Sequence, residues 1–114
     1  MVDTIFVTVP TDINDELPQG LPNSYSISQN YPNPFNLSTA IRYTLPAKSQ
    51  VTISIYNVMG QEVNTIVEGS KSAGSHIVFW DGTDKTGKVV SSGVYFYRIH
   101  AGDFIESKRM MLIK

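Results

Sequence analysis

The chain has 114 residues, 41% of them apolar and 17% charged, with no cysteine and a formal net charge of −1. This length and composition suit one globular domain and exclude a disordered chain, and the missing cysteines exclude thiol catalysis, disulfides and cysteine-ligated zinc. The near-neutral charge argues against a nucleic-acid or anionic-membrane binder, and no apolar run is long enough to span a bilayer as a helix.

The first predicted element is a strand at residues 4–9, where β-branched and aromatic residues run up to Pro10. Residues 10–24 contain prolines, Gly20, Asp and Asn without any hydrophobic period, which indicates a linker. Residues 1–24 hold four acidic and no basic side chains, so they carry −4 and the remaining residues 9 − 6 = +3. The start lacks the basic and apolar regions of a secretory signal peptide, so we expect an intracellular protein or a piece of a longer chain.

From residue 25 onward, short β-rich runs alternate with glycine, proline and asparagine turns. Apolar and polar residues alternate strictly in two of these runs, 41–45 and 51–56. The other predicted strands are 61–67, 76–80, 93–101 and 104–113, with a turn expected over 69–74. A helical turn within 57–67 is a weaker alternative because Gly60 interrupts it. Strands spaced by roughly 8–12 residues predict an antiparallel β-sandwich of about seven strands over residues 25–114.

The aromatic residues are densest in two of these strands. At a period of two, Tyr95, Tyr97 and Ile99 share one face, which favours packing in the core. The alternative is a sugar-binding platform built from Trp80, Tyr95 or Phe96, and it requires two or more exposed rings on one face.

Three loop and strand features could carry chemistry, and none of the patterns is complete. Residues 82–89 approximate a phosphate-binding loop, but Val89 replaces the required Ser or Thr and no helix follows, so we predict a hairpin loop. Asp81 and Asp84 could offer oxygens to calcium, yet the EF-hand pattern fails and turn hydrogen bonds are favoured. His76 and His100 have no nucleophile motif or third ligand nearby in sequence, so we expect neither an enzyme nor a metal or cofactor site.

The final run, residues 108–114, is strand-like with basic residues at both ends. It could close the sandwich, with Lys protecting a sheet edge. It could also be a peptide that a receptor recognises by strand addition, and the two roles are compatible.

Several segments in the right order resemble the C-terminal sorting domain of the type IX (Por) secretion system. The matching segments are 30–36, 40–46, 55–63, 92–99 and 108–114. Residues 80–84 and 93–95 are also similar to the immunoglobulin-like domain of flagellar hook-capping proteins. Leu37 departs from the pattern, where the family commonly has Pro.

The resemblance implies an immunoglobulin-like sandwich without catalytic residues. It implies that the domain directs an exported protein, after periplasmic passage, through the type IX outer-membrane machinery to the cell surface or medium. A sortase-like peptidase would cleave in the linker, and residues 1–9 would be an arm or the last strand of a preceding domain. The carried-over recognition residues are Lys108, Arg109, Met110, Met111, Leu112, Ile113 and Lys114, with Gly93, Tyr95 and Tyr97 as structural support.

A second hypothesis is structural. Residues 4–9 could pair with a sheet edge of a neighbouring copy and build a dimer or an extracellular fibre by strand donation.

Overall fold

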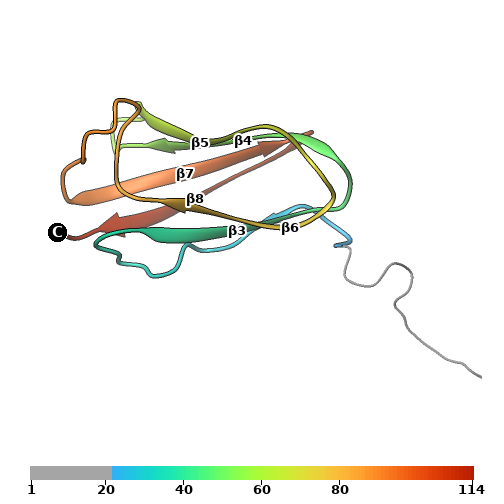
Figure 1. Cartoon of the computed structure of the whole chain (residues 1–114), viewed down its shortest axis with the longest axis horizontal. Helices are drawn as coiled ribbons and strands as arrows, with labels where there is room; N and C mark the ends of the chain where they lie inside the picture. The colour runs from blue at the N-terminus through green and yellow to red at the C-terminus, as the bar shows by residue number, and fades with distance from the viewer. Residues whose placement is uncertain (1–21) are drawn as a thin grey trace, which may run out of the picture.

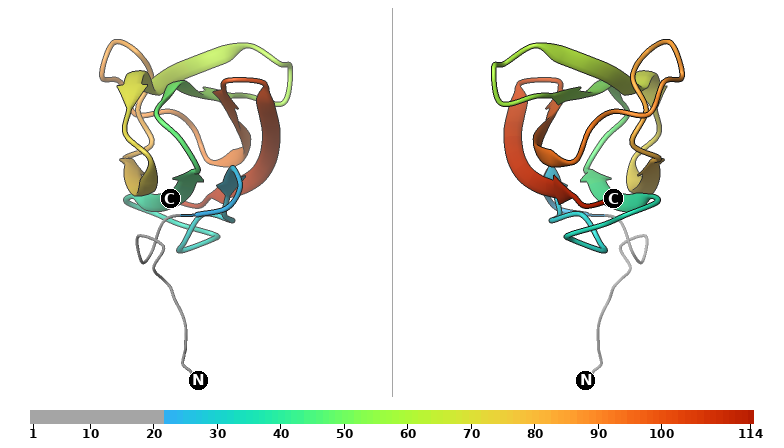
Figure 2. Two further views of the ribbon diagram at one scale, coloured as in Figure 1. Left: turned by 90° about the vertical axis from the view of Figure 1, so that its right-hand side faces the viewer. Right: turned by 90° about the vertical axis from the view of Figure 1, so that its left-hand side faces the viewer.

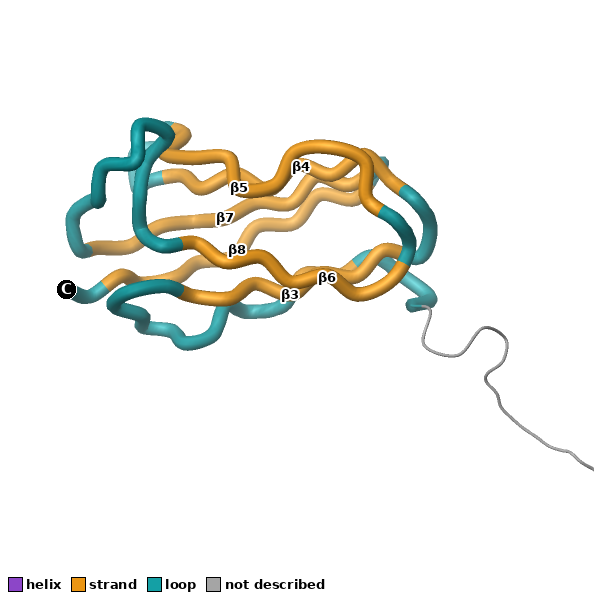
Figure 3. Tube along the Cα trace, in the orientation of Figure 1, coloured by secondary structure: helices purple, strands orange, loops and turns teal. Residues whose placement is uncertain are grey.

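A computed structural model describes residues 22–114, and the structural statements below concern those residues. Within them the chain forms seven strands and no helix, so no helix there could cross a bilayer (Figure 3). The predicted all-β sandwich of about seven strands is confirmed. The predicted arm at residues 1–9 and most of the predicted linker lie outside the described residues.

Two antiparallel sheets pack face to face (Figures 1 and 2). The first sheet has the strand order β2-β3-β6, with bounds Ser26–Ile27, Thr39–Leu45 and Gly74–Trp80. The second sheet has the order β5-β4-β7-β8, with bounds Glu62–Lys71, Ser49–Tyr56, Gly93–Ala101 and Phe104–Leu112. The strand β8 is therefore an edge strand of the larger sheet, which decides how a partner could reach it.

The core forms where the alternating apolar residues of the two sheets meet. On β3 the side chains of Ile41, Tyr43 and Leu45 point inward and are buried, as the strict alternation of 41–45 predicts. On β4, Val51 and Ile53 are fully buried in the same core. Burying one such aliphatic side chain contributes about 1.5–3 kcal/mol relative to leaving it exposed.

The boundary between β5 and β6 differs from the sequence expectation. The sequence predicts a strand over 61–67 and a turn over 69–74, whereas β5 runs to Lys71 and only two residues separate it from β6. Gly69 lies inside β5, opposite Val51 of β4. The strand β4 pairs with β5 both before and after Gly69, so this single glycine does not end the strand. The predicted turn over residues 69–74 was therefore wrong. The helical alternative within 57–67 is also wrong.

The segment before β3 changes sheets, and this positions the candidate site. Its first part follows the smaller sheet, because Tyr31 and Ala40 of β3 exchange two backbone hydrogen bonds of 2.9 and 2.8 Å. Its last part reaches the larger sheet, where Phe35 forms a parallel bridge with Leu112 of β8. We call residues 29–35 the strap.

Candidate functional site

The predicted recognition residues lie mainly in β8, and they alternate between the core and solvent. Met110 and Leu112 point inward and are 1% and 2% exposed. Arg109, Met111 and Ile113 are exposed. Only the exposed members can contact a partner while the domain stays folded.

The predicted support residues lie directly opposite these recognition residues on β7. The register pairs Gly93 with Leu112, Tyr95 with Met110, and Tyr97 with Lys108. Gly93 has φ of +152°, a backbone conformation that residues with a side chain rarely adopt. The structure therefore brings the two predicted groups of residues together, on adjacent strands.

Both tyrosines on the inner face of β7 have their hydroxyl groups satisfied. The Tyr95 hydroxyl donates to the Ser91 carbonyl at 2.7 Å, and the Tyr97 hydroxyl donates to the Ser28 carbonyl at 2.6 Å. Burial raises the pKa of the Tyr97 hydroxyl to about 12. The Tyr97 bond ties β7 to Ser28, which directly precedes the strap. The support role of these tyrosines stays a prediction.

The strap closes the outer backbone edge of β8, a feature that sequence reasoning missed. Gln29 Nε2 donates to the Arg109 carbonyl at 2.7 Å, and the Met111 N–H donates to Asn33 Oδ1 at 3.0 Å. The Phe35 N–H donates to the Met111 carbonyl at 3.0 Å, and the Phe35 carbonyl accepts from the Ile113 N–H at 2.8 Å. The strap sequence carried the family resemblance, but nothing in its pattern indicated a contact about 80 residues away in the chain.

A small pocket lies at the seam between the strap and β8. Its volume is about 160 Å³, too small for more than a side chain or a few waters. Its lining residues are Asn33, Pro34, Val94, Arg109, Met110 and Met111.

Two of the three rings proposed for a sugar-binding platform are buried, so that alternative is wrong. Trp80 is 1% exposed, and its indole packs edge-on against Tyr95 with ring centroids 5.4 Å apart. Tyr95 is also buried, and Phe35 of the strap closes the cluster, 5.7 Å from Trp80. Phe96 is left as a single partly exposed ring of that set, which does not make a platform.

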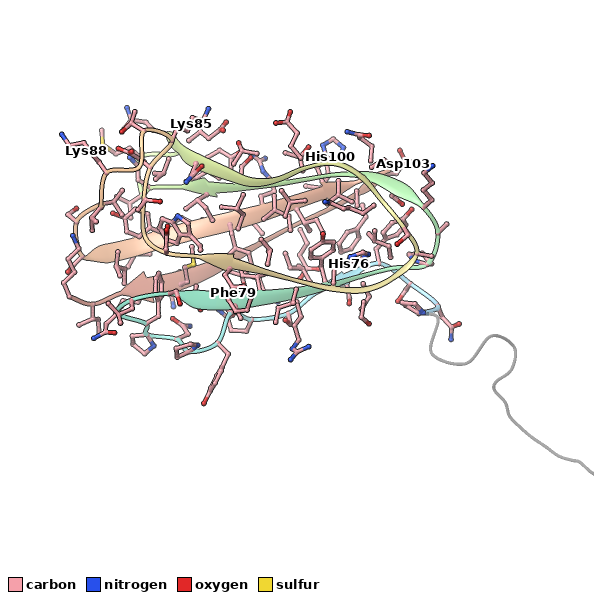
Figure 4. All side chains as sticks on the ribbon, viewed as in Figure 1. His76, Phe79, Lys85, Lys88, His100 and Asp103 are labelled. Atoms are coloured by element: carbon pink, nitrogen blue, oxygen red, sulfur yellow. The ribbon has the colours of Figure 1, made fainter. Side chains whose placement is uncertain are left out.

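The two histidines lie on different sheets, His76 on β6 and His100 on β7 (Figure 4). The His76 ring stacks on Tyr43 at 5.1 Å and its Nε2 lies 2.8 Å from the Ser72 carbonyl. In residues 22–114 no three His, Asp or Glu side chains gather as a metal ion would require. Within that part of the chain, neither histidine therefore belongs to a cluster that could hold a metal ion.

The loop between β6 and β7 closes on itself. Thr83 and Val89 form an antiparallel bridge, as expected of the predicted hairpin loop. Oδ1 of Asp84 accepts from the Thr86 hydroxyl at 2.6 Å and from the N–H groups of Thr86 and Lys88. The hydrogen bond from the Thr86 side chain is the main cause that lowers the pKa of the Asp84 carboxyl. The turn hydrogen bonds that the sequence predicts for Asp84 are therefore present.

Three solved structures that share this fold illustrate the similarity. Dimeric latent PorU from Porphyromonas gingivalis has a TM-score of 0.64 and 21% identity, and the match covers 81% of this chain and 10% of that chain. PorZ, an essential surface component of the type-IX secretion system of the same organism, has a TM-score of 0.50 and 18% identity, with coverage of 79% of this chain and 11% of that chain. FlgD from P. aeruginosa has a TM-score of 0.51 and 24% identity, with coverage of 80% of this chain and 67% of that chain. The chain thus spans about a tenth of the length of PorU and of PorZ. At these identities the similarity establishes the fold.

No curated protein matches this chain in sequence. A family match does exist, and it covers residues 36–103, from the end of the strap region to the turn after β7. These are 68 of the 114 residues, more than half of the chain. The chain therefore belongs to the FlgD Ig-like domain family.

Proposed function

We propose that this domain is a non-catalytic sorting domain that directs an exported protein through the type IX secretion system to the cell surface or medium. The observation that carries the proposal is the run Lys108–Lys114, which resembles the sorting-domain terminus and alternates buried anchors with exposed side chains along an edge strand. The similar folds in PorU and PorZ, a component of that secretion system, support it.

The proposed mechanism is binding, with no bond broken by this chain. The outer-membrane machinery recognises the strand β8, and a sortase-like peptidase cleaves in the linker at residues 10–24. Residues 25–114 form the sorting domain, and residues 1–9 are an arm or the end of a preceding domain.

An export assay tests the proposal. The whole chain is fused to a passenger that carries a signal peptide and is expressed in a type IX host. Removing Met110 to Lys114 should abolish export. Because Met110 and Leu112 are core residues, a second variant removes only Ile113 and Lys114 and leaves both anchors in place. Unchanged export of both variants would contradict the proposal.

A second candidate function is strand donation, and the free edge of β6 favours it. Within the described residues β6 pairs only with β3 and carries no Lys, Arg, Asp or Glu to protect its edge. Ile77 and Phe79 are 45% and 63% exposed on its outer side. Residues 4–9 of a second copy would add to this edge and build a dimer or fibre.

The oligomeric state tests strand donation. Light scattering measures the mass of the whole chain, of a chain without residues 1–10 and of the Ile77→Lys variant. Of these, only the whole chain should form a species larger than a monomer. Ile105→Lys, on the outer side of β8, is the matched control and should leave the larger species intact. A monomer in every case ends this second candidate.

A further inference from the structure

The backbone edge of β8 is occupied where the proposed recognition residues lie. The strap accepts or donates four hydrogen bonds there, to the Arg109 carbonyl, to both backbone groups of Met111 and to the Ile113 N–H. A partner strand that added to this edge would first have to break all four. The side chains, by contrast, are accessible without any rearrangement of the fold.

The exposed side chains of β8 form one surface with those of β7. In the antiparallel register, Arg109 lies opposite Phe96, and Met111 lies opposite Val94. Directly paired residues project to the same side of a sheet, so these four side chains and Arg98 make up what we call the outer β7–β8 face. Phe96 is 36% and Met111 41% exposed, which leaves apolar surface available for contact.

The charge on this face has one sign. Arg98 lies opposite Ser107, which makes Arg98 and Arg109 diagonal neighbours, with backbones about 7–8 Å apart. The Arg98 guanidinium is held over the Tyr56 ring at 4.8 Å, which orients it. The single acidic residue of the two strands, Glu106, points to the other side and contacts Lys108 at 3.3 Å. No carboxylate on these strands neutralises the two arginines.

We propose that the partner recognises β8 through the outer β7–β8 face, with the strap left in place, and that the partner is an acidic protein surface with apolar residues at its centre. This inference rests on the proposed sorting function and specifies how the signal is read. Paired arginines suit bidentate binding of carboxylates, and Phe96 with Met111 supplies the apolar centre that such interfaces use. The exposed apolar side chains of Phe96 and Met111 beside the charges favour a protein over a lipid phosphate.

The same export assay, with the whole chain and folded variants, tests the mode of recognition. Arg109→Glu and Met111→Ser should each reduce the secreted fraction by about tenfold or more, and Arg109→Lys should reduce it less. Arg42→Glu and Phe79→Ser make matched changes on the outer side of the other sheet and should leave export unchanged. Asn33→Ala removes one strap bond and should also leave export within about twofold, since the strap stays in place.

Recognition by strand exchange predicts the opposite pattern. Loosening the strap by Asn33→Ala would then raise export, and Arg109→Glu would have little effect; that result overturns the inference. A lipid partner is tested by flotation of the whole chain with vesicles of lipopolysaccharide and phosphatidylethanolamine at physiological salt. Binding that Arg109→Glu abolishes would assign the face to lipid phosphates and would also overturn it.

The failure of the inference is distinguishable from that of the proposed function. If the fusion is exported and removal of Ile113 and Lys114, which leaves both core anchors in place, also lowers export, the sorting function holds whatever the variants of the outer β7–β8 face do. If neither deletion changes export, the sorting function fails, and the inference fails with it.

Discussion

At the scale of single residues, alternation on β7 predicts the direction of each side chain but not its partner. Tyr95, Tyr97 and Ile99 are buried on one face, as their period-two spacing predicts. The acceptor of the Tyr97 hydroxyl is the carbonyl of Ser28, 69 residues away. A hydrogen bond across that separation depends on how the two sheets pack, which local patterns do not encode.

Tyr97→Phe should lower the free energy of unfolding by about 1–2 kcal/mol, because the Ser28 carbonyl loses its donor inside the sandwich. The pKa of Tyr97 is raised from 10 to about 12 in the folded state, so its contribution is fully present below pH 10. That contribution is lost as the pH rises towards 12. Urea denaturation at pH 8, 10, 11 and 12 measures it.

The stability difference between the wild type and Tyr97→Phe should therefore shrink across this alkaline range. Tyr31→Phe is the control, because Tyr31 is 79% exposed and its change should be neutral at every pH. A constant difference from pH 8 to 12 for Tyr97→Phe would contradict the assignment.

Asp84→Ala should destabilise the loop between β6 and β7, and the effect should depend on acid pH. The Asp84 carboxylate accepts hydrogen bonds from Thr86 and Lys88, and they lower its pKa below the ordinary value of 3.8. Its contribution is present above pH 3.8 and is lost as the pH falls through the lowered folded value. The free energies of unfolding of the wild type and of Asp84→Ala, measured by urea denaturation, should thus converge at low pH.

At the scale of elements, the strap was the part that the sequence could not supply. Its sequence carried a family resemblance, but a parallel bridge between Phe35 and Leu112 joins residues that no local pattern links. The strands themselves, apart from β2 and the end of β5, were predictable because alternation is local. The strand order was not, since several arrangements bury the same faces.

Asn33→Ala should expose one backbone amide of β8 to solvent exchange. The Met111 N–H donates to Asn33 Oδ1 in an exposed position. The free energy of unfolding of the variant should therefore fall by about 0.5–1.5 kcal/mol at most. Amide hydrogen exchange should accelerate at Met111 and stay unchanged at Tyr95 on β7. Asn57→Ala, which removes the side-chain acceptor of a distant turn, should leave the Met111 amide protected. Equal exchange at Met111 in all three proteins would show that the Asn33 side chain does not protect this amide.

At the scale of the whole molecule, the two-sheet body was predictable because its length, turn spacing and alternation all favour the same architecture. The charge division of the chain, −4 in residues 1–24 and +3 in the rest, adds a feature that the fold alone does not explain. The outer β7–β8 face gives part of that positive charge a location, at Arg98 and Arg109. Any acidic segment, from a partner or from this chain, would be drawn to it at low salt.

Removing residues 1–21 should leave the free energy of unfolding within about 0.5 kcal/mol of the whole chain, because the buried apolar side chains of the described sandwich lie between Ile27 and Leu112. Urea denaturation at two protein concentrations, with and without those residues, measures it. A concentration-independent loss of stability in the shorter chain would mean that the removed segment docks on its own sandwich. A loss that grows with concentration of the whole chain would mean that it docks on a second copy, which is the outcome that strand donation to β6 requires.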